Sequence, residues 1–418
     1  MTGLPSTAEA GLPRWRVPPS ARDPRAWHVL AAFAVIGFGI GLTQNGAASV
    51  VQDQMADLDT SVDVLGFTMV AYSLGVVVGA PLIMLGLGRV RRRPLLIAMA
   101  GVFLLTTVAT VLAPTVEVLM AVRFVAGLPH GALLGVASFV AMSVMGRERR
   151  GKAVSIIMLG LTTSLVVGVP LMQWLSNVAS WRMAYVVVAV IAAIGLLGVW
   201  LFTPDVPGDP AASPRSELRA LRGRPLWTAI IAVTVGFAGL GAVFSYIVPL
   251  LEVTNGFASG QVTWILVAWG AAMTCGAYIG GRLTDRSHIG AGRLGLSIAA
   301  LALLGLGLFG DIPVATVVLL VVLASSVQVF SQASQVHLMD VLDGSPSLGS
   351  ALAHAALNAA TAVGTGLGAV VIAWGLGYQA PAWVAVALAA TALVIVVAGP
   401  GYRGPVSWQR TNAPLEQS

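Results

Sequence analysis

Charged side chains are scarce in this sequence. They make up 10% of its 418 residues, whereas 57% of the residues are hydrophobic and the mean hydropathy is +0.88. A soluble domain carries about 25% charged residues, so this composition excludes an ordinary soluble protein. The apolar residues come in blocks of roughly 20, the length that crosses a hydrocarbon core about 30 Å thick. The chain is therefore predicted to be an all-α protein that crosses a membrane many times.

Cysteine and the common catalytic motifs are lacking as well. The single cysteine, Cys275, cannot form an intrachain disulfide and gives no information on the redox compartment. The sequence has no P-loop for ATP, no His-Glu-x-x-His or Cys/His spacing for zinc, and no Gly-x-Ser-x-Gly elbow with credible partners. These absences disfavour an enzyme and direct coupling to ATP, and no cofactor or metal is expected.

Basic residues are present, but they do not predict a nucleic-acid partner. The net charge is +6 and the pI is near 10.1. However, 22 of the 23 basic residues are arginines that lie in short clusters between apolar blocks, without the interleaved aromatics of a strand-binding surface. No nucleic acid is expected among the partners of this chain.

Twelve apolar blocks predict twelve transmembrane helices. They fall near residues 28–51, 64–87, 94–113, 117–144, 153–176, 182–202, 226–251, 261–284, 293–310, 312–335, 347–374 and 380–399. With this count, 21 of the 23 basic residues lie on one side of the membrane, and only Arg123 and Arg182 do not. The positive-inside rule then places both termini in the cytoplasm. The predicted location is the cell membrane, with membrane lipid as a partner.

The longest polar insert within the apolar region, residues 203–224, divides the helices into two sets of six. The predicted organisation is a cytoplasmic N-terminal tail (1–26), an N-terminal six-helix half (27–202), a cytoplasmic linker (203–224), a C-terminal six-helix half (225–400) and a cytoplasmic C-terminal tail (401–418). The halves are weakly alike at an offset of about 200 residues, as in "VIGFGIG" at 35–41 and "TVGFAGLG" at 234–241. Parallel six-helix repeats are a recurrent transporter architecture with the binding site at their interface.

Short motifs lie at the ends of several predicted helices. The second helix ends in "LGLGRVRRRP", with Arg89, Arg92 and Arg93, and the eighth ends in "GGRLTDRSH", with Gly281, Asp285 and Arg286. The fourth contains Arg123 followed by Gly127. The fifth contains "GLTTSLVVGVP", with Gly160, Gly168 and Pro170, and the sixth opens on "SWRMAY".

Together these motifs resemble the major facilitator superfamily, and most closely its twelve-helix drug and arabinose efflux branch of drug:proton antiporters, over roughly residues 28–400. The resemblance implies a carrier whose halves rock about a central site. It also implies that an acid and arginines in the two loop motifs hold neighbouring helix ends together in the outward-facing state. Asp285 supplies the acid in the second copy, whereas Gly88 replaces it in the first. The plain alternative is that these arginines only mark topology.

Arg123 raises the sharpest question, because an arginine near the centre of a membrane helix costs roughly 2.5–3.5 kcal/mol on insertion scales. On a helix Arg123, Gly127 and His130 share one face. We therefore expect this face to line a polar cavity between the halves, together with Gln44 and Asn45 of the first helix. A purely structural role for Arg123 and His130 is the alternative.

Further polar stripes predict the rest of the cavity. Gln328 and Gln332 share a face of the tenth helix, and His354 and Asn358 share a face of the eleventh. Hydrogen bonding between helices is the competing interpretation. Aromatic walls are expected from Tyr72, Tyr246 and Trp264.

The predicted function is secondary active export, by alternating access, of a small organic solute such as a drug, an antibiotic or a sugar-like metabolite. A largely uncharged cavity beside an arginine favours a neutral, amphipathic or weakly anionic solute. Proton coupling through His130 is one hypothesis, because histidine titrates near neutral pH, and uniport or exchange without protons is the other. An uptake facilitator of the same fold, a channel and a sensor that binds solute without moving it are the remaining alternatives. The protein is expected to be a monomer.

Overall fold

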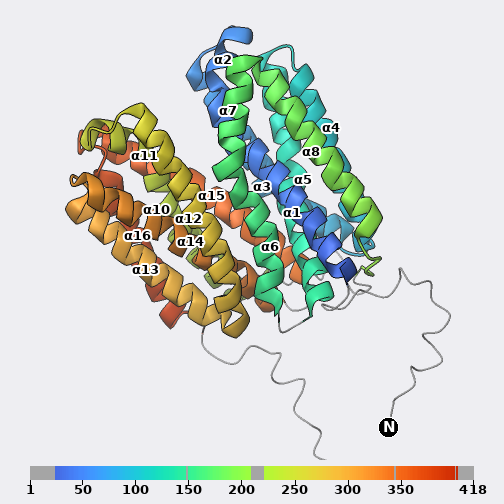
Figure 1. Ribbon diagram of the computed structural model, residues 1–418. Coiled ribbons are helices and arrows are strands. Elements are labelled where there is room, and N and C mark those ends of the chain that lie inside the picture. The colour runs from blue at the N-terminus through green and yellow to red at the C-terminus, as the bar shows by residue number, and fades with distance from the viewer. Residues whose placement is uncertain (1–23, 147–148, 209–220, 343–344, 401, 403–418) are drawn as a thin grey trace, which may run out of the picture.

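The computed structural model describes residues 24–146, 149–208, 221–342, 345–400 and 402 (Figure 1). Within these ranges the chain is helical and contains no strand. The predicted tails lie almost entirely outside the described residues, as does the middle of the 203–224 linker.

Twelve helices of the described chain are long and apolar enough to cross a membrane, as predicted. The first six spans are α1 (Pro24–Asn45), α3 (Val62–Leu87), α4 (Arg92–Leu112), α5 (Val116–Met145), α6 with α7 (Arg150–Thr163 and Val169–Val178) and α8 (Trp181–Phe202). The second six are α10 (Arg224–Phe244), α12 (Ser259–Arg286), α13 (His288–Phe309), α14 (Pro313–Val341), α15 (Pro346–Ala373) and α16 (Ala380–Ala398). Two short helices, α2 (Val51–Asp57) and α11 (Ile247–Pro249), follow the first and seventh spans.

The boundaries of four spans differ by five or more residues from the sequence-based prediction, and the seventh ends at Phe244 instead of continuing to residue 251. The first span ends at Asn45 instead of continuing to residue 51, and the chain turns through Gly46–Val50 into α2. The ninth span already begins at His288, and the tenth continues to Val341. These extensions carry polar side chains that resemble a loop in the sequence, but His337 and Asp340 are buried by neighbouring helices. Burial against protein removes the need for an apolar residue at such a position.

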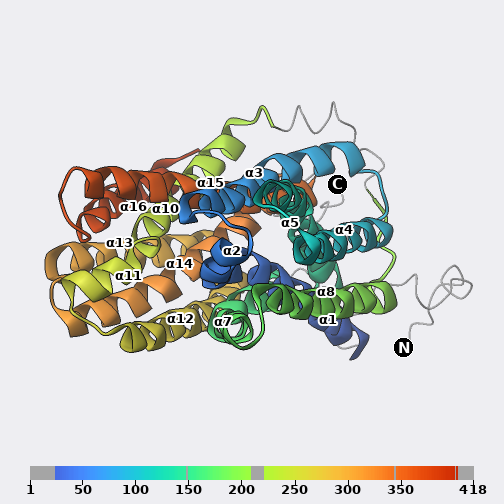
Figure 2. The ribbon, with the colours of Figure 1, turned by 90° about the horizontal axis from the view of Figure 1, so that it is seen from above.

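Each set of six spans forms its own helical bundle (Figures 1 and 2). In the first bundle α1 packs on α6 and α8, and α3 packs on α5; in the second, α10 packs on α15 and α16, and α14 packs on α12 and α13. Apolar side chains fill the interior of each bundle. Large apolar side chains such as Leu105 and Leu112 are also exposed on the outside, which suits contact with lipid and not with water.

The two bundles meet along α6 with α12 and along α15 with α3 and α5. One end of the molecule holds the first turn of α6, the last turn of α12 and arginines 89 and 91–93, and we call it the basic face. We call the end with α2 and α11 the opposite face. The bundles lie closest together at the basic face (Figure 1). There α6 and α12 cross at Gly151 and Gly281, where a Cβ atom on Gly151 would overlap the Gly281 carbonyl oxygen and one on Gly281 would overlap Ser155.

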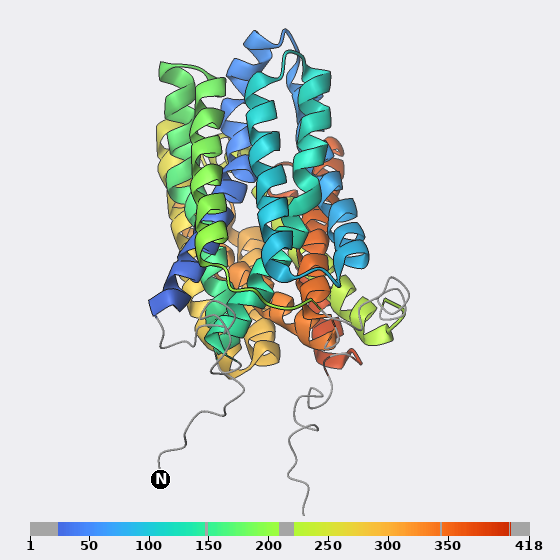
Figure 3. The same ribbon diagram turned by 90° about the vertical axis from the view of Figure 1, so that its right-hand side faces the viewer.

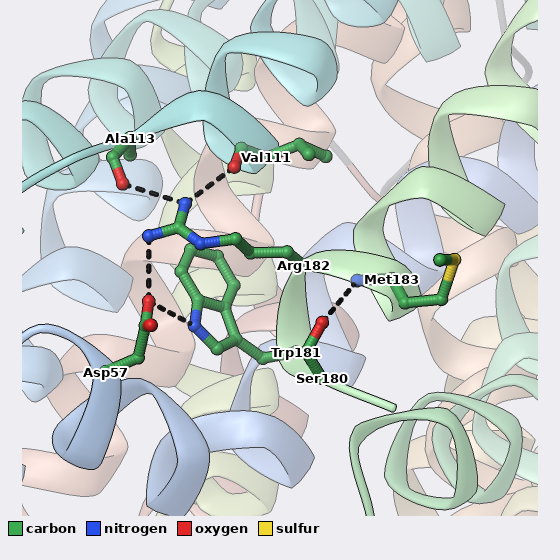
Figure 4. A network of polar contacts seen from close by, with 7 residues as sticks. All are labelled: Asp57, Val111, Ala113, Ser180, Trp181, Arg182 and Met183. Atoms are coloured by element: carbon green, nitrogen blue, oxygen red, sulfur yellow. Dashed lines mark hydrogen bonds and ion pairs between the residues drawn. The ribbon is translucent and has the colours of Figure 1, made fainter. Parts of the chain in front are cut away.

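At the opposite face, Arg182 connects helices of the first bundle (Figure 4), which Figure 3 shows in side view. Its guanidinium donates to the carbonyl oxygens of Val111 and Ala113 at the end of α4, at 2.6 and 2.9 Å, and to the Asp57 carboxylate at 2.7 Å. The Trp181 indole donates to the same carboxylate at 3.0 Å. Because the last carbonyls of a helix have no partner within it, Arg182 satisfies the end of α4 and holds α2 beside α8.

Candidate functional site

A cavity of about 150 Å³ lies between the two bundles. It is lined by α1, α5 and α6 on one side and by α10, α12, α14 and α15 on the other. None of its described lining residues is aspartate, glutamate, lysine or arginine. The lining residues are Gln44, Asn45, His130, Met158, Leu161, Thr162, Leu165, Phe237, Leu240, Gly241, Phe244, Trp269, Met273, Gln328, Ser331, His354, Leu357, Asn358 and Thr361.

Amide side chains form the polar wall of this cavity and join the two bundles. The Gln44 amide nitrogen donates to the Asn358 side-chain oxygen at 3.2 Å. The Asn358 amide nitrogen in turn donates to the His354 carbonyl oxygen at 2.9 Å, and the Asn45 amide nitrogen lies 3.4 Å from the Ser164 hydroxyl. Amides carry both donors and acceptors, so this wall can hydrogen-bond an uncharged polar solute.

Aromatic and thioether side chains also line this cavity. The rings of Phe244 and Trp269 stack with their centroids 5.5 Å apart, and Phe237, Met158 and Met273 line the same cavity. Such residues provide large apolar surfaces, and methionine adapts to irregular shapes. The sequence-based prediction missed these five residues because each lies in an unbroken apolar stretch, where nothing distinguishes it from a lipid-facing neighbour.

Arg123 does not line the cavity, contrary to the expectation from its helix face. It is 2% exposed. Its guanidinium donates to the Thr43 carbonyl oxygen at 2.7 Å and lies over the Tyr72 ring, 4.7 Å from the centroid. Because α1 ends at Asn45, Thr43 presents a carbonyl without an intrahelical partner at the negative end of a helix. This contact and the ring face explain how an arginine is accommodated at this depth.

A chain of polar contacts leads from Arg123 to the cavity wall. The Tyr72 hydroxyl lies 2.7 Å from Nδ1 of His130, whose ring centroid is 6.0 Å from that of His354. On the far side, Nε2 of His354 lies 3.3 Å from the Gln335 amide nitrogen, which also donates to Ser138 of the other bundle at 3.1 Å. His130 and His354 therefore stand at the wall, one from each bundle, with their rings adjacent between two sets of hydrogen bonds.

Six of the ten residues predicted for the binding site line the cavity. They are Gln44, Asn45, His130, Gln328, His354 and Asn358. Tyr72, Arg123, Tyr246 and Gln332 do not. Tyr246 instead donates to the Thr365 carbonyl oxygen at 2.9 Å, and burial raises its pKa, so it stays a neutral phenol. Gln332 is fully buried within its bundle, and Trp264 is 74% exposed and contributes no wall.

Asp285 contacts the other bundle at the basic face. Its Oδ1 atom accepts from the backbone N–H groups of Gly151 and Lys152, at 2.6 and 3.3 Å. These groups belong to the first turn of α6, whose N–H groups have no intrahelical partner. A carboxylate at this position is also favoured by the helix dipole. The neighbouring motif residue Arg286 is exposed at the end of α12.

The arginines of the first loop motif show contacts within their own bundle. Arg92 is 5% exposed and lies over the Phe139 ring at 5.6 Å. Arg93 donates to the Trp200 carbonyl oxygen at 2.7 Å. Arg89 also follows α3 in this loop. These contacts connect the basic ends of α4, α5 and α8.

The remaining predicted motif residues shape the fifth span. Pro170 has no N–H to give to the preceding turn, and the chain widens into a π turn at Ser164–Gly168 just before it. Gly160 packs directly against the Ala34 carbonyl of α1, and Gly168 packs against Leu42. The span is therefore bent between α6 and α7 where it passes the cavity.

No group of three or more histidine, cysteine, aspartate and glutamate side chains that could hold a metal occurs in the described part of the chain.

Comparison with known proteins agrees with this architecture. The chain is 29% identical to the inner membrane transport protein YdhP of Escherichia coli over 367 residues, covering 88% of this chain and 94% of that protein. It is 28% identical to a chloramphenicol resistance protein of Streptomyces lividans over 374 residues, with the same coverage of both chains. The crystal structure of the human organic anion transporter MFSD10 (TETRAN) superposes with a TM-score of 0.68 at 18% identity, covering 92% of this chain and all of that one.

The family model described as Major Facilitator Superfamily matches residues 29–345. Its members and the relatives above are transporters and not enzymes. With twelve membrane-spanning helices in two bundles and a central uncharged cavity, this chain is a multi-pass membrane transporter that belongs to the Major Facilitator Superfamily.

Proposed function

We propose that the protein exports a small, uncharged or weakly anionic organic solute by alternately opening its central cavity to the two sides of the membrane. The observation that carries this proposal is the composition of the cavity wall. Amides, histidines, aromatic rings and methionines line the cavity, and no charged side chain of the described chain does. Such a wall suits an amphipathic molecule.

The charge of the solute follows from desolvation. Moving an ion out of water is costly unless an opposite charge or several hydrogen bonds replace the lost hydration. The cavity offers no carboxylate to a cation. The Arg123 guanidinium lies nearby, over the ring of Tyr72, whose hydroxyl contacts His130 at the cavity wall. A neutral solute, or one with a weak negative charge, is therefore favoured over a cation.

The direction of transport is supported by topology and by one relative. The positive-inside rule assigns the basic face to the cytoplasm, and the bundles meet at this face, so the conformation described above corresponds to an outward-facing one. A relative named chloramphenicol resistance protein favours export, because a transporter that protects a cell from an antibiotic must lower its internal concentration. The name inner membrane transport protein likewise favours a location in the inner membrane.

Proton coupling is proposed to act through His130. The cavity level of α1 carries Gln44 and Asn45, neither of which titrates. His130 stands at the cavity wall, is hydrogen-bonded to Tyr72, and is of the residue type that exchanges protons near neutral pH. Uniport or solute exchange without protons is the competing mechanism.

Ligand binding and transport can be tested on the same purified protein. A panel of neutral, anionic and permanently cationic compounds is screened for thermal stabilisation, which reaches about 2.7 kcal/mol at a ligand concentration 100 times Kd. We expect neutral amphipathic compounds to stabilise the protein, and Asn358→Ala to abolish this effect. Gln52→Ala, which alters an exposed amide on α2, serves as the matched control. Stabilisation by cations alone would contradict the proposed solute class.

The best ligand is then followed in reconstituted vesicles under an imposed pH gradient. Accumulation driven by the gradient, lost in His130→Gln while downhill exchange persists, is the expected result. Accumulation that ignores the gradient would exclude proton coupling. Binding without any movement of solute would identify a sensor, and net inward transport would identify an uptake facilitator.

A further inference from the structure

An ion pair joins the two bundles at the basic face, apart from the cavity. Arg150, the first residue of α6, pairs through Nη1 with Oδ1 of Asp340 near the end of α14. Asp340 is 4% exposed and is the one acidic residue classed as buried among those that the structure describes. A buried carboxylate strongly requires a cationic or hydrogen-bonding partner. Here the partner comes from the other bundle, so the contact can form only while this face is closed.

The same carboxylate also faces a histidine of its own bundle. Nδ1 of His288, the first residue of α13, lies 3.6 Å from Oδ2 of Asp340. The ring of His337 stacks on His288 at 5.4 Å, and Tyr402 stacks on His337 at 4.2 Å. Asp340 is thus placed between a permanent cation across the interface and a titratable ring within its own bundle.

Both histidines of this cluster have ring nitrogens that are not hydrogen-bonded. Nε2 of His288 and both ring nitrogens of His337 have no hydrogen-bond partner within the described ranges, and neither does the Tyr402 hydroxyl. These three side chains line a small cavity of about 10 Å³, close to the space that one water molecule occupies. Burial raises the pKa of Tyr402, so its hydroxyl remains a neutral donor and acceptor beside His337.

The charged groups around this pair are few. Asp340 on α14 and Arg150 on α6 are the ones whose charges act on His288. From α12, Asp285 accepts from the Gly151 and Lys152 N–H groups and interacts with the charges of Arg150 and Lys152. Arg293 of α13 faces the Val396 and Tyr402 carbonyls. The packed helix α16 carries no ionisable residue, and Arg224 of α10 is exposed.

We propose that His288 and His337 form a proton-controlled switch that releases the Arg150–Asp340 ion pair and so opens the basic face. With neutral imidazoles, Asp340 has Arg150 as its cationic partner and the face stays closed. A proton taken from water onto the His288 ring places a second cation beside Asp340. That cation satisfies the carboxylate within its own bundle and repels Arg150, which can return to water only when α6 moves away from α14.

The coupling is reciprocal, as any linkage between two equilibria must be. Protonation favours opening, and opening favours proton uptake from the water on this side. The inference rests on the proposed alternating opening and adds a sensor of pH at the basic face, distinct from His130 in the cavity. Acidification of this side is expected to speed the step that exposes the cavity to it.

The test measures the separation of the bundles directly. Spin labels are placed on cysteines introduced at Ser143 of α5 and Leu294 of α13, both exposed, in a Cys275→Ser background. Pulsed electron paramagnetic resonance then gives the distance distribution at about pH 8 and about pH 5.5. We expect the population with the longer distance to increase about threefold or more at the acid pH. His288→Gln and His337→Gln should abolish this increase.

Two variants complete the design. His28→Gln removes an exposed histidine of α1 that stacks on Phe202, and it should keep the full response to pH. Asp340→Asn removes the buried carboxylate that pairs with Arg150 and should give the longer distance at both pH values.

The outcomes separate this inference from the proposed function. If Asp340→Asn opens the face but the wild-type distance distribution does not change with pH, the switch is refuted while alternating opening stands. The same conclusion follows if both histidine variants respond to pH like the wild type. If neither pH nor Asp340→Asn lengthens the distance, alternating opening itself fails and the switch fails with it.

Discussion

At the scale of single residues, the polar groups of this membrane interior act through one another. Arg123 holds the carbonyl end of α1 and the face of Tyr72, and Tyr72 holds His130 at the cavity wall. Each contact satisfies a group that would otherwise be buried without a partner, at a cost of about 1–3 kcal/mol each. Arg123 therefore positions residues behind the cavity wall, and His130 is the member of this set of contacts that lines the cavity.

This arrangement predicts how Arg123 variants behave. An arginine in a wet cavity could be removed without loss of stability, but the buried one cannot. We expect Arg123→Ala to lower the free energy of unfolding by about 1–3 kcal/mol and to reduce transport. Arg123→Lys should recover little of either, because a point charge cannot both donate to Thr43 and lie flat over a ring. Thermal unfolding in detergent and vesicle transport measure the two effects.

Tyr72→Phe is the matched control for this prediction. It keeps the ring beneath the guanidinium and removes only the hydroxyl that contacts His130. The variant should unfold close to the wild-type temperature and show a changed pH profile of transport. An alanine variant at position 123 with unchanged unfolding would show that the Thr43 contact contributes nothing.

At the scale of elements, two carboxylates of the second bundle bind the first turn of α6 in the first bundle. Asp285 accepts from its N–H groups, and Asp340 pairs with its first side chain. The corresponding end of α15 begins at Pro346 after Ser345, without a side-chain cap among the described residues. Gly88 in the first loop motif offers no acid to supply one. Closure of the basic face is thus asymmetric between the halves.

Asp285→Asn tests this asymmetry. A neutral amide loses the favourable interaction of a carboxylate with a helix N-terminus, worth about 0.3–1 kcal/mol at exposed sites and up to about 2 kcal/mol when partly buried. We expect the conformational equilibrium to shift toward opening at the basic face, with less accessible cysteines at the mouth near α2 and α11. Asp311→Asn, on the opposite side of the molecule and exposed, should leave labelling unchanged. If the labelling of these cysteines is unchanged in Asp285→Asn, the loop that contains Asp285 marks membrane topology and does not stabilise the closed basic face.

The helices could be predicted from the sequence because hydrophobic length and arginine segregation are strong, local signals. Their polar extensions could not. His337 and Asp340 resemble loop residues until the neighbouring helices that bury them are known. The bend at Ser164–Gly168 was indicated only by Pro170, which marks a break but not its form.

At the scale of the whole molecule, the cavity could be predicted only in part. Helix periodicity indicates which residues share a face, and this was sufficient for Gln44, His130 and Asn358. It does not indicate how far a helix is rotated about its axis or which backbone carbonyl lies opposite a side chain. Arg123 was therefore expected to line the cavity, whereas it lies behind the cavity wall and donates to the Thr43 carbonyl oxygen. Trp269 and Phe244 carry no sequence signal at all, because aromatic residues face lipid and cavity alike.

The membrane orientation is a further whole-molecule prediction. Arginine segregation places the basic face in the cytoplasm. Reporter fusions after Gly208 and at the C-terminus should therefore give cytoplasmic signals, whereas a reporter inserted beside Asp59, in the turn that follows α2, should give an external one. A cytoplasmic signal from the turn after α2 would overturn the orientation and, with it, the assignment of the described conformation as outward-facing.

The contact of Gly151 with Gly281 has a consequence for the evolution of this chain. A single added methyl group at either position overlaps the other bundle only when the basic face is closed. We therefore expect mutations at these two glycines to lower the rate of transport without preventing the protein from folding. A natural variant with alanine there would be expected to be abundant, correctly inserted and slow.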